Sequence, residues 1–508
     1  MLNIFRLRNN SIAINKIVIF LTFFLYLFIS IIHLFYPFYT DQAFFNLYAE
    51  MMNKGGILYK DFWDFKQPAI FYFYLLGGKL FSFSEEGIHS FEILYWFCFS
   101  LVIIIYFRKR NFLNNSTLYI LFPLFTVGSY YILANATDLT QVEILVSMPL
   151  AFCIFIMDYY SKTNKILPYF FLGVLFSLVL FYKLIFLLII GGLVVFNIME
   201  IIKIPDLKLK YIFLRKILPA LAGFSILPGL FFIYIFKNDI LEKVISVFFV
   251  LPPKIITELP VVKSFSVFVI NGFGFVKESL PLFILAIPGL FLHSANQRPL
   301  VIKLLIWIVL GTIVIYLQKY SYWHYHYQLL IFPLGILSLI GIDKLITKLS
   351  NSKIIITYFI MIVLLPFGWK TLKEAYSFYI YNPLNSEKRL EYKNHLEPAY
   401  LIIKDDAKFL ENIDNQKKIY VCGTPLYYYF SNRYQPVSTF GYCLEFYFEE
   451  QFEDLVRQLN TVLPEYIFIS KEYFDLLNER GIVFQKFLES NYSKFKENEL
   501  GLWLKKNV

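Results

Sequence analysis

Ionisable side chains recur where apolar stretches of this chain end, and their types suit group-transfer chemistry. Asp41 directly follows the first apolar stretch, and Asp64 and Lys66 lie in the aromatic segment YKDFWDFKQP over 59–68. A carboxylate can take a proton from an attacking hydroxyl group, and an ammonium group can stabilise a departing phosphate. Charged groups at a membrane boundary are costly unless they are used, so the pattern indicates a site, with a solvated loop as the alternative.

Further ionisable groups occupy comparable places later in the chain. Asp138 and Glu143 lie at the turn between the third and fourth apolar stretches, Lys183 lies between the fifth and sixth, and His324 and His326 begin the tenth. With the membrane topology predicted below, all these groups reach the same membrane face as the first three. Such a concentration favours a site that binds substrate over chance placement.

Each of these positions also has a structural alternative. Lys183 can extend to the lipid headgroups, and Asp138 can cap the following helix. His324 and His326, in a strand-like aromatic segment, can be anchors at the membrane interface. A zinc site fits poorly because the two histidines lack nearby cysteines and the i, i+4 spacing of helical zinc ligands. We therefore assign no metal ligand.

Composition defines the class of protein. The chain of 508 residues is 58% hydrophobic and only 17% charged, whereas soluble domains carry roughly 25% charged residues. This predicts a polytopic membrane protein. The net charge of +10 does not indicate nucleic-acid binding, because much of the excess lies in short loops expected to face the cytoplasm. The N-terminal basic residues Arg6, Arg8 and Lys16 precede a long apolar run, which predicts an uncleaved signal anchor.

Eleven apolar segments are long enough to be considered as membrane helices. They lie at about 17–36, 88–107, 116–134, 141–159, 166–182, 184–202, 217–236, 280–293, 301–317, 327–347 and 354–369. With the N-terminus inside, Arg108–Arg110 and most other short basic loops are cytoplasmic, whereas the first external loop carries four lysines against six acidic residues. The loop after the seventh segment is predicted to be external but is rich in lysine, so it departs slightly from this rule. An odd number of crossings places the C-terminal region outside the cytoplasm.

Domain organisation follows from these segments. Residues 1–370 are expected to form a transmembrane catalytic domain whose first extracytoplasmic loop spans 37–87. Within that loop, 41–53 and 68–80 are predicted to be amphipathic helices at the membrane interface. Residues 375–508 have the composition of a soluble domain.

The soluble tail shows signals of a small α/β domain. Strands are predicted at 418–422, 466–470 and 501–504, with a helix at 446–459. Cys422 and Cys443 lie in this tail, and an extracytoplasmic location would allow a disulfide between them, with free thiols as the alternative.

The order of the motifs resembles a known superfamily. It begins with Asp41-x-Ala43 and continues with G-x-x-Y-x-D-F-W-D-x-K-x-P over 56–68. An acidic residue then opens the fourth span, a lysine follows the fifth, and H-Y-Q stands at 326–328. This resembles the GT-C superfamily of membrane glycosyltransferases over almost the whole chain. The similarity is closest to bacterial relatives of protein O-mannosyltransferases, of the aminoarabinose transferase acting on lipid A, and of rhizobial lipopolysaccharide core transferases.

The resemblance implies a fold, a reaction and residue roles. The fold is a polytopic α-helical GT-C-like membrane protein with about eleven transmembrane helices and a small extracytoplasmic α/β domain. Asp41 matches the superfamily's catalytic aspartate, Lys66 the lysine of its Lys-Pro-Pro motif, and Glu143 the acidic residue of its second extracytoplasmic turn. The implied donor is a sugar on a polyprenyl phosphate, used at the outer face of the bacterial plasma membrane.

The residue types fit an inverting transfer. Asp41 is the candidate base, Lys66, Lys183 or His326 would face the lipid phosphate, and Glu143 and Asp64 would orient the acceptor or those cations. The acceptor is a lipid, a glycan or a protein. No cofactor is certain, and a divalent cation is compatible with the chemistry. The alternatives are a flippase or transporter of lipid-linked glycans, which would favour internal repeats and charges at the bilayer midplane, and a glycan polymerase.

Overall fold

The computed structural model describes residues 22–203, 209–260, 263–349, 352–414 and 416–507. Arg6, Arg8 and Lys16 of the predicted signal anchor lie outside the described residues. The chain forms two compact units. The first unit comprises Met1–Phe35, His89–Leu230 and Lys263–Asn382, and the second comprises Tyr36–Ile88, Phe231–Val262 and Pro383–Val508.

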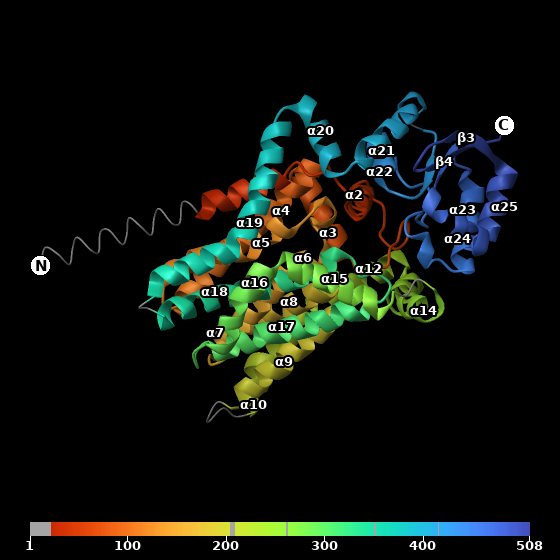
Figure 1. Cartoon of the computed structure of the whole chain (residues 1–508). Helices are drawn as coiled ribbons and strands as arrows, with labels where there is room; N and C mark the ends of the chain where they lie inside the picture. The colour runs from red at the N-terminus through yellow and green to blue at the C-terminus, as the bar shows by residue number, and fades with distance from the viewer. Residues whose placement is uncertain (1–21, 204–208, 261–262, 350–351, 415, 508) are drawn as a thin grey trace, which may run out of the picture. The chain divides into compact units, whose positions relative to one another are not determined.

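The first unit is helical (Figure 1). Its principal helices are the described helix Thr22–His33, α4 (Glu85–Arg110), α7 (Ser147–Tyr160), α8 (Leu167–Tyr182), α9 (Leu187–Ile202), α11 (Leu218–Phe224), α12 (Ile226–Asn238), α15 (Phe265–Glu278), α16 (Leu280–Phe291), α17 (Arg298–Leu317), α18 (Ile331–Lys348) and α19 (Lys353–Tyr381). The helices α4 and α12 begin or end in the second unit.

The apolar segments predicted from the sequence are helical where the structure describes them. Within the described part of the chain, seven helices are long and apolar enough to cross a membrane: Glu85–Arg110, Val142–Tyr160, Leu184–Ile202, Lys210–Asn238, Arg298–Leu317, His324–Lys348 and Ile354–Tyr381. The pair α15 and α16, bent by 83°, is an eighth if it forms one span. Thr22–His33, Leu118–Leu133 and Leu167–Tyr182 are shorter apolar helices. The chain is therefore a multi-pass membrane protein, and the count of eleven crossings stays a prediction.

Two glycines allow α16 and α18 to pack closely in the first unit. A Cβ atom on Gly289 would lie 2.2 Å from the Leu337 carbonyl oxygen, and one on Gly341 would lie 1.9 Å from the Leu285 carbonyl oxygen. Small residues at such crossings let helix backbones approach, which is the usual way helices associate in a bilayer. This packing holds the middle of α18 (Ile331–Lys348), the helix that follows the turn carrying two histidines of the candidate site.

The second unit contains residues 36–88, which include the first long loop, together with the tail. The loop contributes α2 (Thr40–Asn53) and α3 (Ala69–Leu80), so both predicted helices of this loop are confirmed as helices. Residues 41–49 of α2 are all buried, and α2 packs against α3 and against α22 (Leu426–Ser431) of the tail. Protein therefore covers the faces of α2 that the sequence assigned to the membrane interface. The division of the chain at 370 and 375 stays a prediction.

The tail contains the predicted strands. A sheet in the order β1-β2-β4-β3 is built from β1 (Ile419–Cys422), β2 (Tyr466–Ser470), β3 (Tyr492–Glu497) and β4 (Gly501–Lys506). Strands β1 and β2 are parallel, and β4 pairs antiparallel with both β2 and β3. The sequence missed β3 because this edge strand has the mostly exposed sequence YSKFKE, without an apolar alternation.

Helices complete the second unit. They are α13 (Leu241–Ile245), α14 (Leu251–Glu258), α20 (Ser386–Leu396), α21 (Ala399–Ala407), α23 (Glu449–Val462), α24 (Phe474–Glu479) and α25 (Ile482–Asn491). The predicted helix at 446–459 corresponds to α23, with Glu449 and Glu450 in its first turn. Cys422 and Cys443 are both free thiols.

Candidate active site

Asp41 lies in the first turn of α2. The Tyr39 backbone N–H donates to the Gln42 side chain at 2.6 Å, which caps the helix start. A carboxylate at this end is favoured by the helix dipole. The hydroxyl group of Tyr442, from the tail, donates to Asp41 Oδ1 at 3.0 Å. The helix and the tail thus together fix the position of this carboxylate.

Lys66 joins two carboxylates of the first loop. Its Nζ lies 3.9 Å from Asp41 Oδ1 and 3.7 Å from Asp64 Oδ2, and 4.9 Å from the centre of the Phe45 ring. The backbone of this segment is held because Tyr59 donates its hydroxyl hydrogen to the Lys66 carbonyl oxygen at 2.8 Å. We call Asp41, Asp64 and Lys66 the loop cluster.

The electrostatics of the loop cluster differ between its members. Asp64 is buried and accepts a hydrogen bond from the Phe65 N–H at 2.7 Å. Burial raises the pKa of the Asp64 carboxyl above its ordinary value, and this outweighs the opposing effect of Lys66. The Lys66 side chain keeps 23% exposure. Its ammonium group is therefore accessible to an anionic ligand, while its two carboxylate neighbours are more deeply placed.

In the first unit, Glu143 pairs with an ammonium group and an imidazole ring. Lys183 donates to Glu143 Oε1 at 2.7 Å, and His326 Nε2 lies 3.6 Å from the same oxygen. Lys183 also donates to the amide oxygen of Gln318. The Glu143 side chain is 1% exposed, so these partners compensate a buried charge. We call Glu143, Lys183 and His326 the helical cluster.

Local structure explains how the helical cluster forms. Lys183 has extended backbone between α8 and the following 3-10 turn η4 (Leu184–Phe186), so it interrupts two apolar helices. Glu143 lies in α6 (Val142–Leu145). His326 lies in the 3-10 helix η7 (His324–Leu330). The segment expected to be strand-like is therefore helical, because η7 continues directly into α18.

Asp138 and His324 form a second pair beside Glu278. His324 Nδ1 lies 3.0 Å from Asp138 Oδ2, and His324 Nε2 lies 3.4 Å from Glu278 Oε2. Gln141, rather than Asp138, is the N-cap residue of α6, so the alternative of Asp138 as a cap of that helix is wrong. Asp138 instead accepts from the Asn135 N–H at 3.2 Å and fixes the turn before α6.

Several residues of these clusters were missed by sequence reasoning. Tyr442 is one of many tyrosines in the chain and has no local signal. Glu278 is the last residue of α15, at the bend before α16. In the sequence it cannot be distinguished from a charged residue of a solvated loop.

Glu92 was also missed, although an ionisable residue within an apolar span is a functional-site signal by default. It accepts from Tyr130 at 2.6 Å and from the Thr140 hydroxyl at 2.9 Å, and Thr140 has left-handed backbone with φ 55°. Glu92 therefore holds the turn that carries Asp138.

The predicted site residues thus gather in two places. Asp41, Asp64 and Lys66 are together in the second unit, and the other five, Asp138, Glu143, Lys183, His324 and His326, are in the first. Their convergence on one membrane face stays a prediction. Among the residues that the structure describes, no group of three or more His, Cys, Asp or Glu side chains is arranged to hold a metal ion.

Comparison with known proteins identifies the fold. No family model and no curated protein matches the sequence. The structure is similar to the crystal structure of ArnT from Cupriavidus metallidurans bound to undecaprenyl phosphate, with a TM-score of 0.59, 11% identity, and coverage of 97% of this chain and 96% of that chain. For ArnT in the apo state the TM-score is 0.61 at 12% identity, with coverage of 97% and 98%.

A weaker likeness, with a TM-score of 0.45 and 10% identity, is to the Archaeoglobus fulgidus oligosaccharyltransferase, over 96% of this chain and 73% of that chain. The similarity to ArnT extends over nearly the full length of both chains. The chain therefore has the GT-C fold, in a polytopic helical protein with a small C-terminal sheet, as the sequence predicted.

Proposed function

We propose that this protein transfers a sugar from a polyprenyl-phosphate donor to a lipid, glycan or protein acceptor on the extracytoplasmic face, with inversion at the anomeric carbon. The observation that carries the proposal is the loop cluster, in which the Asp41 carboxylate lies 3.9 Å from the Lys66 ammonium group. The carboxylate can take the proton of an attacking hydroxyl group, and the ammonium group can stabilise a departing phosphate. The GT-C fold supports this reaction class.

Asp41 is the proposed general base. The acceptor oxygen forms a bond to the anomeric carbon while the bond from that carbon to the phosphate oxygen breaks, through an oxocarbenium-like state. The acceptor proton goes to Asp41, and the lipid phosphate leaves with the electron pair. Tyr442 orients the Asp41 carboxylate through its hydrogen bond of 3.0 Å, because a base must be held within reach of the proton it takes.

Lys66 is the proposed partner of the donor phosphate. Its ammonium group is partly exposed and lies near the carboxylates of Asp41 and Asp64. A charge-assisted hydrogen bond from such a group to a phosphate oxygen is shorter and stronger than a neutral one. The undecaprenyl phosphate bound to ArnT in the similar structure supports a polyprenyl phosphate as the lipid carrier.

The remaining predicted residues have supporting roles in this proposal. Lys183 and His326 offer further positive charge to the phosphate, with Glu143 holding both in place. His324 and Asp138 contribute a second polar pair that contacts the sugar or the acceptor.

The test is to supply membranes containing the full chain with radiolabelled polyprenyl-phosphate sugars and to identify the product that acquires label. We expect transfer of the sugar to one acceptor class, with loss of transfer in Asp41→Asn. Parallel assays with added Mg²⁺ or a chelator test the divalent cation that the chemistry allows. Movement of an intact lipid-linked glycan between leaflets, without a new glycosidic bond, would support the flippase alternative instead.

A further inference from the structure

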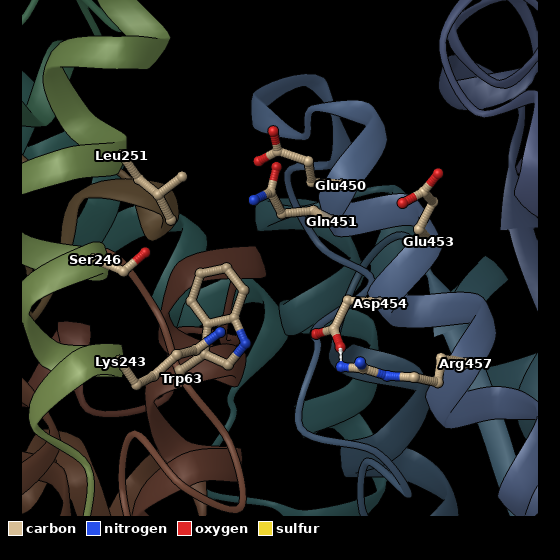
Figure 2. A pocket seen from close by; sticks show the side chains of 9 residues that line it. All are labelled: Trp63, Lys243, Ser246, Leu251, Glu450, Gln451, Glu453, Asp454 and Arg457. Atoms are coloured by element: carbon tan, nitrogen blue, oxygen red, sulfur yellow. Dashed lines mark hydrogen bonds and ion pairs between the residues drawn. The ribbon is translucent and has the colours of Figure 1, made fainter.

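A polar cavity of about 440 Å³ lies within the second unit (Figure 2). One wall is formed by residues 243–251 around α13 and α14, and the other by the first turns of α23. Trp63 lies between these walls in Figure 2. The volume falls in the range of small-molecule pockets, roughly 300–1,000 Å³.

The lining of this cavity is mostly polar. Trp63 and Leu251 are its only two apolar side chains among the described residues that line it. Ser246 and Gln451 provide hydroxyl and amide groups, and carboxylates outnumber the cationic groups of Lys243 and Arg457. An acyl chain would find too little apolar surface here, and a phosphate would meet an excess of negative charge.

Trp63 supplies a polar group without a partner. The residue is 1% exposed, and its indole N–H has no hydrogen-bond acceptor among the residues that the structure describes. Phe440 and Phe65 pack edge-on to the ring at centroid distances of 5.0 and 5.5 Å, while Lys243 Nζ lies 3.9 Å from the ring centre. A buried indole N–H usually finds an acceptor, so an oxygen of a ligand would satisfy it.

Three hydrogen-bond donors hold the Asp454 carboxylate in place. Thr439 and Gln458 donate to its Oδ2 at 3.2 and 2.8 Å, and Arg457 donates to its Oδ1. A carboxylate offers about four lone-pair sites, so these three donors leave room for one more. Lys254 of α14 lies 3.5 Å from Glu450 of α23, so an ion pair joins the elements that form the two walls.

We infer that this cavity binds a saccharide, the glycan part of the acceptor that receives the transferred sugar. Sugar hydroxyls both donate and accept hydrogen bonds, which matches a lining of carboxylates, an amide, a hydroxyl, a guanidinium group and a free indole N–H. The location fits an acceptor subsite, because Trp63 directly precedes Asp64 of the loop cluster. This inference rests on the proposed function for the identity of the ligand as acceptor.

The test measures saccharide binding without any donor. The full chain in lipid nanodiscs is applied to an array of neutral, amino and acidic oligosaccharides together with short peptides. We expect binding to at least one class of oligosaccharide. The double variant Gln451→Ala/Asp454→Asn should bind about tenfold more weakly, since two hydrogen bonds are lost, and Trp63→Phe should also bind more weakly.

The matched control is Glu489→Gln on α25, an exposed position outside the cavity, which should bind as the unmodified chain does. Thermal unfolding of every variant shows whether it is folded, and the two cavity variants provide independent results if one is not. Presenting the bound oligosaccharide either free or attached to a lipid in the nanodisc distinguishes a soluble glycan from a lipid-anchored one.

The outcomes separate this inference from the proposed function. Absence of saccharide binding, binding only to peptides, or unchanged binding in both cavity variants would overturn the saccharide site, even if sugar transfer is observed. Saccharide binding that depends on Gln451 and Asp454, in a chain that transfers no sugar from any polyprenyl-phosphate donor, would uphold the cavity and reject the proposed reaction.

Discussion

The Lys66 ammonium group lies 3.9 Å from the Asp41 carboxylate, although the remainder of α2 and residues 54–65 separate the two residues in sequence. At this distance the Lys66 ammonium group attracts the carboxylate electrostatically. The proposed base and the proposed phosphate ligand can be tested by separate mutations, because each side chain has a further partner. Asp41 also contacts Tyr442, and Lys66 also lies near Asp64.

Replacing Asp41 by Asn is expected to lower the rate of transfer by roughly 10²–10⁴-fold, because the amide keeps the shape of the side chain but cannot take a proton. The measurement is single-turnover transfer from a radiolabelled donor. Asp61→Asn, at an exposed position in the same loop, is the control and should retain activity. Near-normal turnover in Asp41→Asn would leave Asp64 or Glu143 as the base.

Replacing Lys66 by Met is expected to weaken donor binding by about tenfold to a hundredfold, since a hydrogen bond to a charged group contributes about 1.5–3 kcal/mol. Titration of the donor into the purified chain gives the dissociation constant. Lys60→Met, in the same loop but exposed, should leave it unchanged. Unaltered donor affinity in Lys66→Met would remove Lys66 from the phosphate site.

Lys183→Met is expected to lower the free energy of unfolding by about 3–5 kcal/mol, because it leaves the buried Glu143 carboxylate without its ammonium partner. The double variant Glu143→Gln/Lys183→Met should recover part of this loss, since no buried charge then remains unpaired. Unfolding midpoints in detergent for Lys183→Met, Glu143→Gln and the double variant measure the coupling between the two side chains. Additive effects would show that the pair contributes little to folding.

The acid–base behaviour of Lys243 gives a pH prediction. Burial lowers the pKa of this ammonium group to about 8 from its ordinary value of 10.5, and Asp454 opposes the shift only in part. Between these two values the unfolded chain holds more protons than the folded chain, so this group makes stability rise with pH across that window. Unfolding midpoints measured from pH 7 to 10 should rise less in Lys243→Met than in the control Lys486→Met.

The orientation in the membrane is a further prediction. The distribution of lysine and arginine places Arg108–Arg110 in the cytoplasm and residues 375–508 outside it. A reporter fused at residue 508 should be active only if it requires export, and one inserted after Arg110 only if it requires the cytoplasm. Activity of a cytoplasmic reporter at residue 508 would reverse the predicted face of the tail.

The local sequence pattern was sufficient to predict many of the helices and strands of this protein, although it missed β3. Apolar runs such as 184–202 and 301–317 become spanning helices, and 466–470 becomes β2, because burial in lipid or in a sheet core acts on consecutive residues. The residue types at Asp41, Lys66, Glu143 and Lys183 likewise drew attention to positions that lie in the loop cluster and the helical cluster, since an ionisable group at the end of an apolar run can be recognised in the sequence.

Only the tertiary structure decided which of these groups are partners. Tyr442 of the tail donates to Asp41. Glu143 contacts both Lys183 and His326. Glu278, at the bend between α15 and α16, contacts His324. Trp63 and Asp454 line one cavity from opposite parts of the chain. A buried polar group takes whichever partner the packing brings within hydrogen-bond distance, and that packing depends on helix crossings such as Gly289 against α18, which no local pattern specifies.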